Sequence, residues 1–357
     1  MTSGPDVAAR TPTTGRLAWV DAAKGMSILL VVLHHSVWFL QNSGQAPAAV
    51  VAANEALASL RMPLFFLASG LFVAGPLATP WRTLLHKRVA FFLYLYAIWT
   101  IIRFTFFATV IPPGVDPDDS ANPVGLAWAL LLPGPSLWFI YALAVFAVVA
   151  KLLRPVPVGL QLGAAAVLSA LVGAGLLDFG GTRWSYMARL FVFFLLGCYA
   201  RHLVERLAGA TSLVRVAVAA VVCVGSAGVA VAFELRSIPG VALALQCVAV
   251  GFGVLFAAWI CRYRLGRPLI WLGERTLPIY LIHMLWLALI MTGVRLVDLP
   301  TVVAYALPAV LVVVLTALAL LTHRVLVAAG ATWLFALPSR LAYRAPKPQD
   351  AGPPPGR

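Results

Sequence analysis

Charged residues are scarce in this sequence: they make up 11% of its 357 positions. A soluble globular domain usually carries about 25%, so the polar shell that a water-soluble core needs is missing. Hydrophobic residues reach 62%, and they recur in runs of about 20 residues, the length with which an α-helix crosses the hydrocarbon layer of a bilayer. The composition excludes a soluble domain and predicts an all-α integral membrane bundle.

Acidic residues are the scarcest charged type, with 12 Asp and Glu against 26 Lys and Arg and a formal net charge of +14. A basic excess of this size also occurs in nucleic-acid-binding proteins. In those proteins the basic residues gather on a soluble domain, whereas here they are scattered among short loops between apolar runs. We therefore expect the lipid bilayer as a partner and no nucleic acid.

Cysteine is rare too, and the four cysteines show no paired spacing. This argues against a disulfide framework or a zinc site, and we expect no metal and no permanently bound cofactor. The first apolar run also lacks the features of a cleavable signal peptide, because it contains Asp21, Lys24 and two histidines and no small-residue cleavage site follows it. We expect it to remain as the first span of a multi-pass protein of the cell (plasma or inner) membrane.

The chain divides into three regions. We predict a disordered cytoplasmic lead over residues 1–18, a membrane domain over 19–335, and a disordered tail, rich in Pro and basic residues, over 336–357. A short segment, Val124–Leu132, cannot span and predicts an interfacial or re-entrant helix. The apolar runs predict about ten transmembrane helices, at roughly 22–40, 58–77, 89–111, 136–153, 158–177, 188–204, 213–233, 240–260, 277–294 and 302–328.

The loop charges predict the orientation of these spans. Cytoplasmic loops carry an excess of Lys and Arg, and with a cytoplasmic N-terminus 20 of the 26 basic residues fall on inner segments. The outer loops then hold four arginines and an acidic cluster. These are Arg183, Arg189, Arg236 and Arg295, with Asp116, Asp118 and Asp119. The alternation predicts an even number of spans and two cytoplasmic termini.

The first span carries the strongest candidate set, Asp21, Lys24 and His35. At about 100° per residue, Lys24 and His35 fall within about 20° of each other on one helix face, with Asp21 about 40° and His34 about 80° away. Ionisable groups in hydrocarbon cost a few kcal/mol or more, and histidine suits proton transfer from a hydroxyl near neutral pH. We predict His35, with Lys24 and Asp21, as catalytic. The structural alternatives are a histidine that only hydrogen-bonds a neighbouring helix and a snorkelling lysine.

A second polar set opens the ninth predicted span, where Thr276, Tyr280 and His283 follow i, i+4, i+7 spacing and share one helix face. A rise of about 1.5 Å per residue places His283 about 10 Å along the helix, in its cytoplasmic half. These residues line the path of the substrates or, alternatively, form a polar packing seam.

A third set surrounds the second and third spans. Ser69 and Gly70 predict a close approach of two helices, as small residues do in membranes. Arg61 is expected near the outer interface and Arg103 in the outer half of the third span. Both arginines are candidates for the substrate path, and both could instead snorkel to the interface.

These regions together resemble the acyltransferase-3 superfamily of multi-spanning membrane enzymes, and most closely its sugar O-acetyltransferase-like branch. Each motif is weak, but their order covers nearly the whole chain. The matching residues are Asp21, Lys24, Gly25 and His35; Met62 to Gly70; Lys87 and Arg88; Leu137, Trp138 and Phe139; Phe194, Gly197 and Tyr199; and Ile279, Tyr280, Leu281 and His283.

The resemblance implies a cytoplasmic acyl-CoA donor, with acetyl as the default acyl group, and a hydroxyl acceptor on a cell-envelope sugar or a secreted metabolite. It implies that His35 deprotonates the acceptor or relays the acyl group. Tyr280, His283, Arg61, Arg103 and Ser69 would line the path. The CoA phosphates would be held by basic residues, namely Lys87, Arg88, Arg262, Arg264 and Arg267; positive-inside bias is the alternative explanation for each of these.

Three departures from the family pattern stand out. Arg61 occupies a position where many relatives have histidine, the third span has Tyr94 and Tyr96 where a Pro is often found, and we expect no fused esterase-like domain. The main competing function is a transporter or flippase of a polar or lipid-linked solute, but no pair of Gly/Pro-interrupted helices in related halves supports it. A non-catalytic scaffold would not explain the shared face of Lys24 and His35. The acceptor and the oligomeric state stay open.

Overall fold

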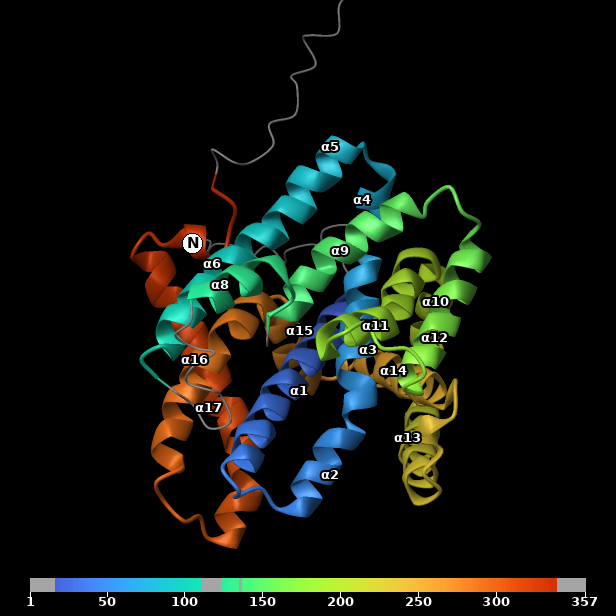
Figure 1. Cartoon of the computed structure of the whole chain (residues 1–357). Helices are drawn as coiled ribbons and strands as arrows, with labels where there is room; N and C mark the ends of the chain where they lie inside the picture. Colours follow the sequence, from blue (N-terminus) through green and yellow to red (C-terminus); the bar gives the residue numbers. More distant parts are fainter. Residues whose placement is uncertain (1–16, 111–122, 135–136, 339–357) are drawn as a thin grey trace, which may run out of the picture.

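The computed structural model describes residues 17–110, 123–134 and 137–338. Every regular element in these ranges is helical, and the elements form one bundle (Figure 1). Most of the predicted lead and tail, and the acidic cluster at Asp116, Asp118 and Asp119, lie outside the described residues.

The helices follow one another along the chain with short connections. They are α1 Ala18–Asn42, α2 Ala48–Ala56, α3 Ala58–Leu71, α4 Ala74–Ala78, α5 Trp81–Leu84, the π-helix η1 Leu85–Val89, α6 Ala90–Phe107, α8 Pro123–Leu131, α9 Trp138–Leu152, α10 Val158–Gly173, α11 Thr182–Tyr199, α12 Arg201–Gly209, α13 Leu213–Ala232, η2 Leu235–Ser237, α14 Val241–Ile260, η3 Arg264–Gly266, α15 Arg267–Gly273, α16 Thr276–Val294, α17 Thr301–Ala328 and η4 Thr332–Leu334.

Seven spans in the described ranges are long and apolar enough to cross a membrane, or eight if the bent pair α11–α12 is one span. Two shorter apolar helices, α9 and α10, have 15 and 16 residues. The protein is therefore a multi-pass membrane protein, while ten spans and cytoplasmic termini stay predictions.

Three predicted spans differ from the observed helices. The span predicted at 188–204 is wrong as a straight helix, because α11 ends at Tyr199 and α12 continues at a bend of 80°. The break comes where the apolar run gives way to the charged segment Arg201–Gly209, which is strongly amphipathic and remains at a surface. Arg183 and Arg189, predicted for an outer loop, lie within α11 instead.

The second and third spans begin earlier than hydropathy indicates, at Ala48 and Trp81, and end at Leu71 and Phe107. Hydropathy does not detect the start of the second span, because the polar pair Asn54 and Glu55 interrupts the apolar run. The predicted short helix at Val124–Leu132 is observed as α8.

Glycines set the closest helix contacts. A Cβ at Gly25 on α1 would collide with the backbone of Leu269, and one at Gly273 on α15 with the backbone of Asp21. Gly70 on α3 and Gly197 on α11 face each other in the same way. The close approach predicted at Ser69-Gly70 is thereby confirmed, and part of the motif pattern reflects packing.

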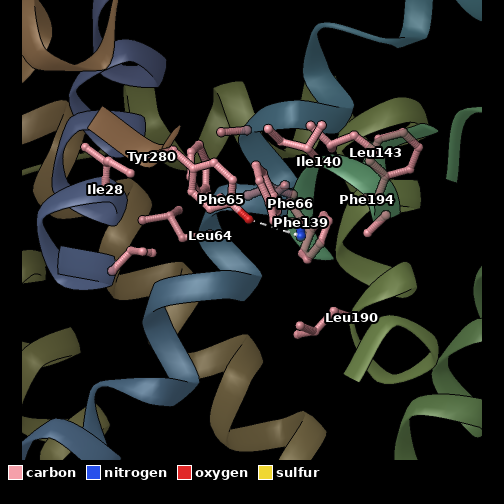
Figure 2. Packing of buried hydrophobic residues seen from close by; sticks show 14 of the residues in the cluster. Ile28, Leu64, Phe65, Phe66, Phe139, Ile140, Leu143, Leu190, Phe194 and Tyr280 are labelled. Carbon is pink, nitrogen blue, oxygen red and sulfur yellow. Dashed lines mark hydrogen bonds between the residues drawn. The ribbon is translucent and has the colours of Figure 1, made fainter. Parts of the chain in front are cut away.

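Aromatic rings fix the start of α9 in the centre of the bundle (Figure 2). The ring of Phe139 stacks on Phe65 at 4.4 Å between centroids and lies 4.8 Å from Phe66. Phe146 lies further along α9, and its ring centroid is 4.9 Å from that of Phe191 and 5.4 Å from that of Phe194, both on α11. Phe139 is thereby packed against α3, and Tyr280 of α16 also contacts its ring.

Candidate active site

Two cavities lie along α1. A cavity of about 530 Å³ is lined by His34 and His35, together with residues of α2, α3, α9, α11, η2, α14 and α16, and we name it the histidine cavity. A second cavity of about 310 Å³ is lined by Lys24, Ser69, Arg88 and Thr276, and we name it the lysine cavity. The polar face predicted for α1 therefore serves two separate cavities.

In the histidine cavity, His35 contacts His283 of α16. His35 Nδ1 lies 3.1 Å from His283 Nε2, and the ring centroids are 5.1 Å apart. His283 is fully buried, and its Nδ1 lies 2.8 Å from the carbonyl oxygen of Ile279. The two histidines, 248 residues apart in sequence, thus form a pair that the spacing on either helix does not predict.

The hydrogen bonds of this pair assign its protons. A carbonyl oxygen only accepts, so Nδ1 of His283 carries the proton and, in the neutral ring, Nε2 is an acceptor. His35 must then donate from Nδ1 to His283, which leaves the lone pair of His35 on Nε2. A neutral His35 of this tautomer can accept a proton from a hydroxyl placed in the histidine cavity.

His34 has different partners. The Asn54 side-chain amide donates to His34 Nδ1 at 3.2 Å, and Arg61 donates to the Asn54 carbonyl oxygen at 3.1 Å. Arg61 is only 7% exposed, so it does not reach the interface as a snorkelling side chain would. The predicted preference for His35 over His34 agrees with this arrangement, because Asn54 occupies the His34 ring nitrogen that could accept a proton.

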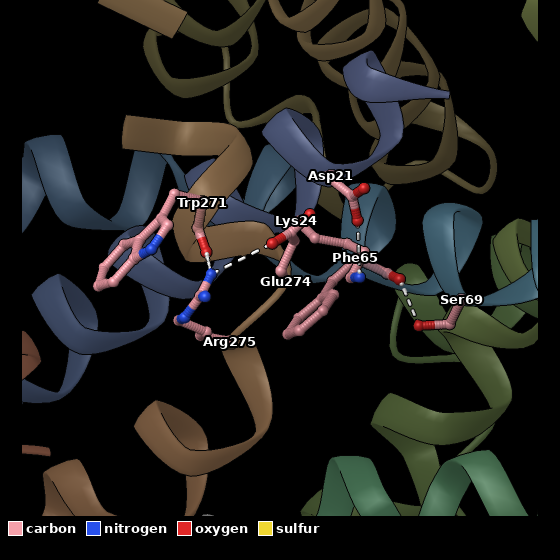
Figure 3. A network of polar contacts seen from close by, with 7 residues as sticks. All are labelled: Asp21, Lys24, Phe65, Ser69, Trp271, Glu274 and Arg275. Atoms are coloured by element: carbon pink, nitrogen blue, oxygen red, sulfur yellow. Dashed lines mark hydrogen bonds and ion pairs between the residues drawn. The ribbon is translucent and has the colours of Figure 1, made fainter. Parts of the chain in front are cut away.

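In the lysine cavity, Lys24 is paired with Asp21. The Lys24 ammonium lies 3.1 Å from the Asp21 carboxylate and 5.1 Å from the centre of the Phe72 ring, and Figure 3 shows the pair near Ser69. Asp21 is 1% exposed, and it does not line either cavity. Its carboxylate compensates the charge of Lys24, so the structure gives Asp21 a supporting position beside the lysine.

Tyr280 and Phe139 line both cavities. The Phe139 backbone N–H donates to the Tyr280 hydroxyl at 3.3 Å, and the two rings meet edge to face at 5.7 Å (Figure 2). These two residues form the wall between the histidine cavity and the lysine cavity.

The remaining predicted residues fall into two groups. Arg103 is buried, with its guanidinium 5.0 Å from the centre of the Phe107 ring, and Ser69 donates to the Phe65 carbonyl at 2.8 Å. Arg88 lines the lysine cavity and donates to the Phe72 carbonyl at 3.4 Å. The others are exposed and line neither cavity, namely Lys87, Arg262, Arg264 and Arg267.

Two parts of the histidine cavity were not predicted from the sequence. Asn54 lies before the predicted second span, and Arg189, predicted for an outer loop, lies in α11 beside Gln246 of α14. Gln246 is a lone amide within an otherwise apolar helix, and such polar residues in a span are the signal that would have identified them. Within the described ranges, no group of three or more His, Cys, Asp or Glu could hold a metal ion.

The comparisons with known proteins identify the family of the chain. The model of the acyltransferase-3 family, described as an acyltransferase domain, matches residues 17–322. This chain belongs to the acyltransferase-3 family. The resemblance to this family stated from the sequence motifs is thereby confirmed, and both cavities lie inside the matched region.

One curated relative of this chain is the inner membrane protein YcfT of Escherichia coli (strain K12). It is 28% identical over 153 residues, which cover 38% of this chain and 43% of the relative. The matched part thus spans less than half the length of that relative. No solved structure matches the chain.

Proposed function

We propose that this acyltransferase moves an acyl group, in the first instance acetyl, from cytoplasmic acyl-CoA to a hydroxyl of a cell-envelope sugar or a secreted metabolite at the inner membrane. The observation that carries the proposal is the hydrogen-bonded pair of His35 and His283, which leaves a free ring nitrogen on His35 beside a cavity. The match to the acyltransferase-3 family does not favour the transporter alternative.

In the proposed reaction, His35 Nε2 takes the proton of the acceptor hydroxyl while the hydroxyl oxygen attacks the thioester carbonyl carbon. The C–S bond then breaks, and the proton on His35 passes to the leaving sulfur. The products are the acyl ester and CoA with a free thiol. His283 is a positioning residue, because its hydrogen bond to the Ile279 carbonyl sets the ring that orients His35.

The lysine cavity is the proposed entry of the donor. Lys24 and Arg88 line it, and two cations suit the phosphates of CoA. On the predicted orientation, this end of α1 faces the cytoplasm. A cavity of about 310 Å³ suits the pantetheine arm, whose thioester would have to reach His35 past the wall of Tyr280 and Phe139. The exposed Arg262, Arg264 and Arg267 remain candidates for the outer phosphates only.

The test uses purified protein in proteoliposomes with acetyl-CoA and candidate acceptors, and it measures release of free CoA thiol and the acylated product. We expect His35→Ala to lower kcat by about 10²–10⁴-fold, the range of general-base catalysis. The control is His202→Ala, an exposed histidine on α12 that lines neither cavity. Full turnover by folded His35→Ala protein would refute the assignment.

A further inference from the structure

We infer that the histidine cavity selects acceptors that carry an anionic group, a carboxylate or a phosphate, next to the hydroxyl that is acylated. This inference rests on the proposed function and adds a substrate class to it. It is carried by three arginines that line the cavity from three different elements: Arg61 of α3, Arg189 of α11 and Arg236 of η2.

None of these arginines is neutralised by a carboxylate within the part of the chain that the structure describes. The ion pairs there join Lys24 to Asp21, Arg201 to Glu205 and Arg275 to Glu274. The cavity lining includes one carboxylate, that of the exposed Glu55. With neutral histidines, three guanidinium groups against one carboxylate give the lining an excess of two positive charges.

Two of the guanidinium groups are held in place by neutral partners. Arg61 donates to the Asn54 carbonyl oxygen at 3.1 Å. With the side-chain oxygen of Gln246 turned toward it, Arg189 donates to that oxygen at 3.1 Å, and its guanidinium lies 5.3 Å from the centre of the Tyr186 ring. Amide and aromatic partners orient a guanidinium without cancelling its charge. Since a guanidinium has five N–H donors, donors remain for a ligand.

The burial of Arg61 favours a ligand site over simple snorkelling. A charged side chain inside a membrane costs a few kcal/mol or more, and Arg61 is only 7% exposed. A partner amide offsets part of this cost, whereas an anion bound in a bidentate manner offsets more. Arg61 belongs to the same hydrogen-bonded chain as His34, next in sequence to His35. An anion held there would lie beside the hydroxyl that His35 deprotonates.

The size of the cavity fits one sugar unit or a comparable metabolite. Small-molecule sites have volumes of about 300–1,000 Å³, and this cavity has about 530 Å³. The aromatic side chains of Trp138, Phe139 and Tyr186 complete the lining, and such faces suit the apolar side of a sugar ring.

The test compares three methyl hexosides that differ only at C6: methyl glucoside, methyl glucuronoside and methyl glucoside 6-phosphate. Their binding to the full-length protein in nanodiscs is measured by saturation-transfer NMR titration without acyl-CoA. We expect at least one anionic sugar to bind about tenfold tighter than the neutral one, as charge-assisted hydrogen bonds allow. The carboxylate and phosphate arms identify the preferred anion.

Variants test whether the arginines cause the tighter binding of the anionic sugars. Arg189→Gln and, separately, the exposed Arg236→Gln should reduce the anionic preference to about threefold or less, while Arg189→Lys should retain part of it. Arg236→Gln changes a surface residue and so keeps the test valid if Arg189→Gln does not fold. The control is Arg295→Gln, an exposed arginine outside the cavity lining, which should keep the full preference.

Equal binding of the three sugars, no measurable binding of any of them, or a full preference in both Gln variants would overturn the inference. Because the measurement needs no acyl donor, it is independent of the proposed function. Protein that prefers the anionic sugars but never acylates a hydroxyl would refute the proposed function, and only the anion-binding site of the histidine cavity would stand. Protein that acylates neutral and anionic sugars equally would support the proposed function and refute this inference.

Discussion

The two ends of the polar face on α1 differ in how their charges are compensated. At the Lys24 end, a carboxylate of the same helix lies 3.1 Å from the ammonium. There, Gly273 of α15 packs directly against the backbone of Asp21. At the His35 end, the partners come from α16, and the bonds join neutral groups. The Lys24 end holds an ion pair and, in the same cavity, Arg88, which suits an anionic donor. The His35 end holds a polarised ring suited to moving a proton.

The largest effect on turnover in these variants is expected from changing the partner of His35. In His283→Phe the ring of His35 loses the acceptor that orients it, and we expect kcat to fall about 10–100-fold with little change in the KM of acyl-CoA. His283→Gln, whose amide oxygen can accept from His35, should retain more activity. Steady-state kinetics of acetyl-CoA consumption measures both. If the KM of acyl-CoA changed instead of kcat, the proposed division between the two ends would be wrong.

The next change acts on the opposite end. Lys24→Met removes the ammonium from the lysine cavity, and we expect the KM of acyl-CoA to rise about tenfold, which corresponds to ~1.4 kcal/mol of binding, with a smaller effect on kcat. Lys24→Arg should preserve most of the affinity. The matched control is Arg206→Met, an exposed basic residue on α12. If Lys24→Met lowered kcat as much as His35→Ala does, Lys24 and His35 would both act in the chemical step, and the proposed division between the two ends would be wrong.

The smallest effect on turnover is expected from the glycine contact. In Gly273→Ala the added methyl group meets the backbone of Asp21, and overpacking of this kind costs about 1–3 kcal/mol. We expect a lower melting temperature in detergent and a modest rise in the KM of acyl-CoA. Gly228→Ala is the control, because nothing lies within 4 Å of a Cβ there. An unchanged melting temperature in Gly273→Ala would show that α15 moves away freely.

Much of the fold and half of the candidate site are predictable from the sequence. Hydropathy gives the all-helical membrane bundle, and helix periodicity places Lys24 and His35 on one face, which agrees with the way Tyr280 and Phe139 line the cavities at both positions. The contact of His35 with His283 is not predictable from spacing, because periodicity gives the face of a helix and says nothing of its height relative to a neighbour.

The basic residues illustrate the other limit. Arg88 lines a cavity, whereas Lys87, Arg262, Arg264 and Arg267 are exposed and line neither. In sequence all of them satisfy the same positive-inside bias, so only the packing of η1, η3 and α15 and of the turn after α14 separates them. Asn54 and Arg189 were misplaced for a related reason, since hydropathy assigns a polar residue to a loop even where it faces a cavity within the bundle.

The wall of Tyr280 and Phe139 has an electrical consequence. If the histidine cavity opens to the outer side of the bilayer and the lysine cavity to the cytoplasm, water enters from both sides and the insulating layer narrows to these two side chains. The transmembrane potential, about 2.3 kcal/mol per elementary charge per 100 mV, then falls almost entirely across them. If this wall opened wide enough for a thioester while no substrate filled the opening, protons would leak across the membrane. Substitution of Tyr280 by a small residue is therefore expected to dissipate a proton gradient in vesicles as well as to impair acylation.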